Sequence, residues 1–190
     1  MEQTVVFIKP DGVKRGLVGE IVHRFERMGL KIVAMKMVKP TEEHFHKHYG
    51  TNKESTISRL GGKTLATYTK YGKDAKKDLG SDDPMVLGQM VVKWLLAYVQ
   101  SGPVVAMLIE GRHAVDNVLA LAGPTMPVNA APGTIRGDYS TDSAAYANEE
   151  HRGVSNLIHI SGSLEEANFE KTLWFTPEEI HDYKRAEDHV

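Results

Sequence analysis

A histidine in an apolar stretch, followed by a carboxylate on a helix, is the arrangement in this sequence best suited to chemistry. His159 lies in the run 157–160, and Ser163 and Glu166 have the spacing of a helix capping box. That helix carries Glu170 on the same face, where it can return to orient the imidazole. An oriented imidazole can be a nucleophile, a base or a metal ligand. The commoner alternative is a core histidine satisfied by a neighbour.

Length and composition indicate a single domain. The 190 residues are 41% hydrophobic, and we expect one domain over 1–190 with an insertion at about 50–100. A net charge of -2 argues against nucleic acid as a partner. The absence of cysteine excludes disulfides and thiolate metal sites. Because no apolar run has membrane-spanning length and no secretory leader is visible, we expect a cytoplasmic protein.

Lys9 is the first candidate for binding an anion. It follows the continuous apolar run Thr4–Ile8, which is typical of a buried strand. It precedes Pro10-Asp11-Gly12, a sequence that favours a turn. A lysine at the end of a buried strand can point into a cleft, although most lysines keep their ammonium group at the surface.

The long loop predicted at 123–138 offers further groups for phosphate oxygens. Its prolines restrict the backbone, and it carries the hydroxyls of Thr125 and Thr134 and the guanidinium of Arg136. Long loops in compact domains are often functional. The alternative is an ordinary surface loop with an ion-paired arginine.

The helix predicted at 41–49 contains His44, His46 and His48. The first and last share a helix face, but His46 points away from them, so the cluster is a weak metal site. We predict a polar helix exposed to solvent.

The segment 50–101 contains a glycine pair that resembles a phosphate-binding loop. The stretch Gly61-Gly62-Lys63-Thr64 lacks the earlier glycine that such a loop requires, because that position is Ile57. Asp83-Pro84 begins a helix whose apolar stripe suits packing against the main domain or a neighbouring subunit.

The predicted order of elements gives an α/β (α+β) fold of the ferredoxin-like βαββαβ type, a four-stranded antiparallel sheet with helices packed on one face, plus a helical insertion. Its strands are expected at 4–8, 30–38, 103–109 and 172–175. Function does not follow from this plan alone.

Several motifs, in order, resemble the nucleoside diphosphate kinase family, in an extended form similar to its archaeal members. They are Val6-Phe7-Ile8-Lys9-Pro10-Asp11-Gly12-Val13, Arg15-Gly16-Leu17-Val18-Gly19-Glu20-Ile21, Ser101-Gly102-Pro103-Val104-Val105-Ala106-Met107, Pro132-Gly133-Thr134-Ile135-Arg136-Gly137-Asp138 and Asn156-Leu157-Ile158-His159. The resemblance implies a ping-pong phosphotransferase that moves the terminal phosphate of a nucleoside triphosphate to a nucleoside diphosphate. It also implies Mg²⁺ held through the nucleotide phosphates and a homo-oligomer, either hexamer or tetramer.

The resemblance also implies a role for each matching residue. His159 is expected to carry the phosphate and Glu170 to orient it. The residues expected to bind the nucleotide are Lys9, Tyr49, Thr125, Arg136 and Asn156.

Three departures leave room for a second hypothesis, a catalytically weakened nucleotide sensor or interaction protein. Leu119 stands where the family has a second phosphate-binding arginine. The insertion replaces the segment that carries the family's base-stacking phenylalanine, and Tyr68 or Tyr71 are the candidates for that role. Residues 139–153, expected as a loop, lengthen the approach to Asn156.

Overall fold

The computed structural model describes residues 1–185, so positions 186–190 of the predicted domain lie outside the described residues. A four-stranded antiparallel sheet has the order β2-β3-β1-β4, which is the ferredoxin-like topology expected from the sequence. Its strands are β1 (Glu2–Ile8), β2 (Lys31–Val38), β3 (Val104–Gly111) and β4 (Ile158–Ile160).

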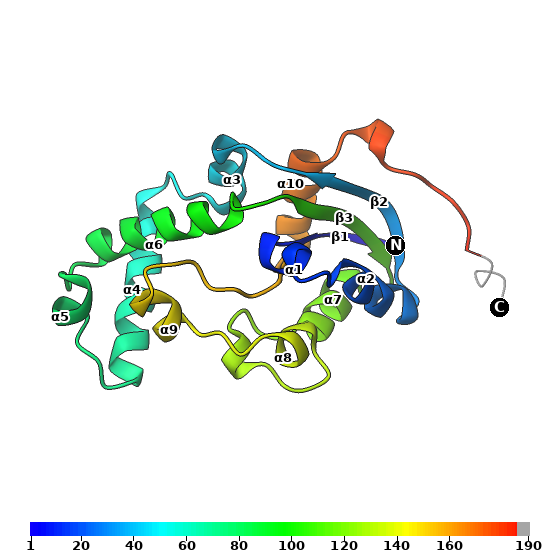
Figure 1. Cartoon of the computed structure of the whole chain (residues 1–190). Helices are drawn as coiled ribbons and strands as arrows, with labels where there is room; N and C mark the ends of the chain where they lie inside the picture. Colours follow the sequence, from blue (N-terminus) through cyan, green and yellow to red (C-terminus); the bar gives the residue numbers. More distant parts are fainter. Residues whose placement is uncertain (186–190) are drawn as a thin grey trace.

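Helices surround the sheet and extend from one end of it (Figure 1). They are α1 (Pro10–Lys14), α2 (Val18–Arg27), α3 (Glu42–Tyr49), α4 (Glu54–Lys70), α5 (Ala75–Leu79), α6 (Pro84–Val99), α7 (Ala114–Ala122), α8 (Ile135–Tyr139), α9 (Ala144–Glu149) and α10 (Leu164–Trp174), with short 3₁₀ turns η1 (Pro127–Asn129) and η2 (Pro177–Glu179). Within the described residues, none of the helices combines the length and apolar character that a membrane span requires.

Helices cover both faces of the sheet, so the prediction of one covered face is wrong. Alternate side chains of β1 enter two cores: Val6 and Ile8 pack with α2 and α7, while Val5 and Phe7 pack with α3, α6 and α10. The continuous apolar runs of β1 and β3 are the reason, since a strand buried on both faces has no polar side to present to water.

The fourth strand is β4, and the strand predicted at 172–175 is wrong. Thr172 to Trp174 continue α10, and the Thr172 hydroxyl donates to the carbonyl of Phe169 within that helix. Trp174 is buried among core residues. A short apolar run does not by itself distinguish a strand from the buried end of a helix.

The glycine pair of the insertion lies inside α4, which confirms that it is not a phosphate-binding loop. Gly61 packs against the backbone of Pro84, and Gly88 of α6 packs against the backbone of Ile57. The missing side chains therefore let α4 and α6 cross in close contact. Beyond the crossing, Tyr68, Ala75, Leu79 and Leu87 form a small separate core.

Candidate active site

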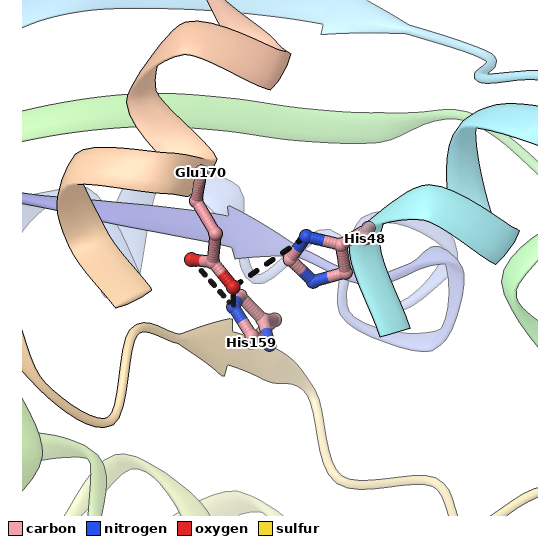
Figure 2. A group of neighbouring side chains, drawn as sticks. All are labelled: His48, His159 and Glu170. Atoms are coloured by element: carbon pink, nitrogen blue, oxygen red, sulfur yellow. Dashed lines mark hydrogen bonds and ion pairs between the residues drawn. The ribbon is translucent and has the colours of Figure 1, made fainter. Parts of the chain in front are cut away.

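The imidazole of His159 is held on two sides. Its Nε2 atom lies 2.9 and 3.0 Å from the two carboxylate oxygens of Glu170. Its ring stacks on Phe7, with centroids 4.7 Å apart and planes 18° apart. Glu170 also accepts a hydrogen bond from the Ser161 hydroxyl at 2.6 Å. As Figure 2 shows, the histidine comes from β4 and the glutamate from α10, so two elements fix the ring as predicted from the sequence.

The surroundings of His159 keep the ring neutral. Burial lowers its pKa well below the usual value, and the cations of Lys9 and Arg136 lower it further. Burial raises the pKa of Glu170, while neighbouring groups act in the opposite direction. Because the carboxylate needs a donor, the imidazole proton belongs on Nε2. The Nδ1 atom keeps its lone pair, so it is the ring nitrogen that can act as a nucleophile.

Lys9 and Asn156 form a buried pair beside this ring. The Lys9 ammonium donates to Asn156 Oδ1 at 2.6 Å, and Asn156 Nδ2 donates to the carbonyl of Thr125 at 3.0 Å. Burial lowers the pKa of Lys9 to about 7, with a further contribution from Arg136 and an opposing one from Asp11. Thr125 itself is exposed and joins the site through its backbone.

Arg136 binds the backbone around the site. Its Nε, Nη1 and Nη2 atoms donate to the carbonyls of Asn156, Gly123 and Ile158 at 3.2, 2.6 and 2.8 Å. A guanidinium has about five N–H groups. Within the described residues these three carbonyls use one N–H each, so about two N–H groups remain to bind a ligand oxygen. Burial lowers the pKa of Arg136 to about 10, which leaves it charged at neutral pH. Thr134 does not join it, because its hydroxyl caps α8.

Tyr49, at the end of α3, points a phenol toward the same region. Its ring lies 6.1 Å from that of His159, and among the described residues its buried hydroxyl has no hydrogen-bond partner. Burial raises the pKa of Tyr49, so the hydroxyl remains a donor. A buried donor without a partner is expected where a ligand supplies the acceptor.

His48 is a site residue that the sequence interpretation missed, and the prediction of a solvent-exposed helix is wrong for this face. Its ring packs edge-on against His159 with centroids 4.3 Å apart. Burial lowers the pKa of His48, and its Nδ1 accepts from Trp174 Nε1 at 3.1 Å. Nδ1 also lies 3.5 Å from Glu170, but its lone pair is already used, so this is not an ion pair. Phe45 three residues earlier was the available signal that this face is buried.

Neither candidate for the role of the base-stacking phenylalanine lies at the site. Tyr68 is buried in the small core of the insertion, and Tyr71 is exposed beside Lys70. Leu119 is half-buried in α7, and nothing in the structure explains the loss of an arginine there.

Metal ligands in this region are few. The side chains of His48, His159 and Glu170 each bring one ligand atom within 4.8 Å of the others. Two imidazoles suit a borderline metal such as zinc better than magnesium, which prefers oxygen. The Trp174 hydrogen bond already occupies one of those nitrogens. The chemistry of this cluster therefore suits the positioning of an imidazole better than the binding of magnesium.

The chain matches a known protein family over most of its length. The sequence model described as "Nucleoside diphosphate kinase" matches residues 2–59 and 87–180. It passes over 60–86, which fall inside the predicted insertion.

Individual relatives match almost the whole chain. A nucleoside diphosphate kinase of Pyrobaculum aerophilum is 47% identical over 180 residues, which are 95% of this chain and 98% of the relative. The crystal structure of an NDP kinase from the same organism superimposes with a TM-score of 0.89 at 46% identity, over 95% of this chain and 99% of that one. A transition-state mimic of the Borrelia burgdorferi enzyme with bound vanadate and ADP gives 0.77 at 34% identity, over 98% and 94%.

Proposed function

The chain belongs to the nucleoside diphosphate kinase family, and we propose that it carries out the family's phosphotransfer through a covalent phosphohistidine at His159. The observation that supports this best is the ring itself, neutral and fixed by Glu170 with Nδ1 left as the nucleophile. The sensor hypothesis is not favoured, since relatives named nucleoside diphosphate kinase match almost the whole chain and the hydrogen bond of His159 to Glu170 supports the phosphotransfer.

The reaction has two matching halves. The Nδ1 lone pair of His159 attacks the terminal phosphorus of a nucleoside triphosphate, and the bond to the diphosphate breaks. The diphosphate leaves, a second one binds, and its terminal oxygen takes the phosphoryl group from the histidine. Glu170 accepts from Nε2–H throughout and stabilises the positive charge that the ring gains on phosphorylation. Lys9 and Arg136 supply positive charge to the phosphates, and Tyr49 supplies a neutral donor.

Magnesium is the metal we propose for this reaction, held by the nucleotide phosphates and water. The protein side fits this arrangement, because the nearby carboxylates already have partners: Glu170 binds His159 and Ser161, while Asp11 binds Tyr98 and the backbone of Leu157. When bound, Mg²⁺ neutralises charge on the phosphate oxygens.

The nucleobase, on this proposal, lies in a cavity of about 280 Å³ between α6 and residues 151–155. Trp94 and His151 stack there, with ring planes 8° apart. The cavity adjoins the Lys9–Asn156 pair, because the ring centroid of Tyr98 in its wall lies 5.7 Å from the Lys9 ammonium and Ser155 precedes Asn156. Stacking on aromatic faces accepts any base, as a kinase acting on many nucleotides requires.

Two further proposals rest on the family resemblance. We expect a homo-oligomer, a hexamer or a tetramer, in the cytoplasm. Edge strand β2 exposes Met35 and Met37, which gives an assembly apolar surface to cover. The mass in solution, measured by light scattering, tests this expectation, and a monomeric mass would contradict it.

The experiment that tests the function is labelling with a triphosphate that is radioactive at its terminal phosphate. We expect an acid-labile phosphoprotein in the wild type that loses its label to any added diphosphate. His159→Ala should form none. In Glu170→Gln the amide can donate to Nε2 and shift the proton to Nδ1, so labelling should slow by about 10²–10⁴-fold. Equal labelling of wild type and His159→Ala would reject the assignment.

A further inference from the structure

The backbone between Asn156 and His159 adopts an unusual turn. Leu157 has φ 69, and the N–H of Ile158 donates to the carbonyl of Asn156 at 2.8 Å. A hydrogen bond between residues two apart around a positive φ defines the classic γ-turn, which is rare and strained. A branched residue such as leucine has no intrinsic preference for it. Leu157 is also fully buried, so the turn lies inside the protein.

Three groups outside the turn hold this conformation. The Leu157 N–H donates to Asp11 Oδ2 at 3.1 Å, and its carbonyl accepts from the backbone N–H of Lys9 at 2.7 Å. Arg136 donates to the preceding carbonyl at 3.2 Å. Strained residues persist where such contacts over-determine the backbone.

Asp11 is itself fixed by the insertion side of the molecule. Its second oxygen, Oδ1, accepts from the hydroxyl of Tyr98 at 2.6 Å. Tyr98 lies near the end of α6, and its hydrogen bond to the carboxylate is partly buried. One carboxylate therefore connects α6 to the turn that precedes the catalytic histidine.

The turn has functional groups on both sides. Asn156, before it, accepts from Lys9, and His159, after it, is bonded to Glu170. We propose that Asp11 is a positioning residue: its carboxylate, locked by Tyr98, holds Leu157 at positive φ and so sets the sugar-binding amide and the nucleophile relative to each other. This role rests on the proposed phosphotransfer and adds a residue that contacts neither phosphate nor the reacting ring.

The first test replaces the carboxylate. Asp11→Ala should slow phosphohistidine formation by about 100-fold, the scale of an error of about 1 Å in alignment. Asp11→Asn is the matched control, since its amide oxygen accepts from Leu157 and its NH₂ group donates to Tyr98. It should restore the rate to within about five-fold of the wild type, because both partners keep a hydrogen bond, with the direction of the one to Tyr98 reversed. Thermal melts of the variants report folding separately.

The second test acts on the backbone and distinguishes positioning from stability. Glycine adopts positive φ without steric cost, whereas alanine does not, and both remove the leucine side chain. In the Asp11→Ala background, Leu157→Gly should therefore label at least about 10-fold faster than Leu157→Ala.

Equal rates for that pair, or an unchanged rate in Asp11→Ala, would overturn the positioning role. Absence of label in the wild type would instead overturn the proposed function, so the two failures are distinguishable.

Discussion

Lys9 shows how burial changes the chemistry of a single residue. Its usual pKa of 10.5 falls to about 7 because the ammonium is desolvated and faces Arg136. Between those two values the unfolded chain binds a proton that the folded chain lacks, so the free energy of unfolding from this group rises with pH across that window. A bound phosphate stabilises the ammonium, so binding and protonation are coupled.

We therefore predict that ADP binding at pH 8 takes up about 0.9 proton per site through Lys9, the fraction that a pKa of about 7 leaves unprotonated. Isothermal titration calorimetry in two buffers with different ionisation enthalpies measures that number.

Lys9→Arg is the control. Its guanidinium stays charged at about pH 8, so this variant should take up no proton at position 9, while any proton that ADP itself gains or loses on binding is still measured. Identical proton counts in wild type and variant would show that Lys9 is already charged in the free enzyme.

At the level of residues, the sequence predicted several of the side chains that the structure brings together. His159 and Glu170 are joined as their spacing suggested, and Lys9 and Asn156 lie beside them. His48 was missed because a polar side chain on a short helix is usually exposed, and burial is a property of the tertiary packing. The γ-turn at Leu157 was not predictable, since leucine carries no signal for positive φ.

At the level of elements, the packing of the insertion depends on the close crossing of α4 and α6. A side chain at Gly61 would overlap the backbone of Pro84, while one at the exposed Gly62 would meet nothing within 4 Å. The same substitution therefore has opposite consequences at neighbouring positions of one helix.

We predict that Gly61→Ala destabilises the fold by roughly 1–3 kcal/mol or more through overpacking. Gly62→Ala should stabilise it by roughly 0.5–1 kcal/mol through helix propensity. Thermal and urea unfolding measure both. If Gly61→Ala were as stable as Gly62→Ala, the helices would not cross as closely as described.

The sequence predicted that a helical insertion exists but not how it packs. Gly61 and Gly88 do not reveal the helix crossing from the sequence, because the backbone segments that they pack against are known only from the fold. In the sequence alone, a glycine within a helical pattern only weakens the prediction of a helix. The wrong strand at 172–175 has a similar origin, because an apolar segment is buried in either conformation.

For the molecule as a whole, the insertion contacts the lengthened segment before Asn156. Lys73 forms an ion pair with Glu149, and Trp94 stacks on His151, so the insertion and the segment 139–153 meet beside the site. Figure 1 shows α9 beside α4, away from the sheet.

We predict that Trp94→Ala raises the KM for ADP and other diphosphates roughly 10-fold with kcat within about two-fold, because a stacking surface for the base is lost. Steady-state kinetics with several diphosphates measure this effect. Tyr71→Ala removes an exposed aromatic from the same insertion and should change neither constant. A raised KM in Tyr71→Ala with an unchanged KM in Trp94→Ala would indicate that the base stacks on Tyr71 instead.

The crossing of α4 and α6 also bears on how this part of the chain was acquired. The family pattern stops at residue 59 and resumes at 87, and these positions lie between the contact of Ile57 with Gly88 and that of Gly61 with Pro84. The intervening segment leaves the domain and returns to it at nearly the same place. A stretch with adjacent ends can enter or leave a gene in one event without displacing the rest of the fold.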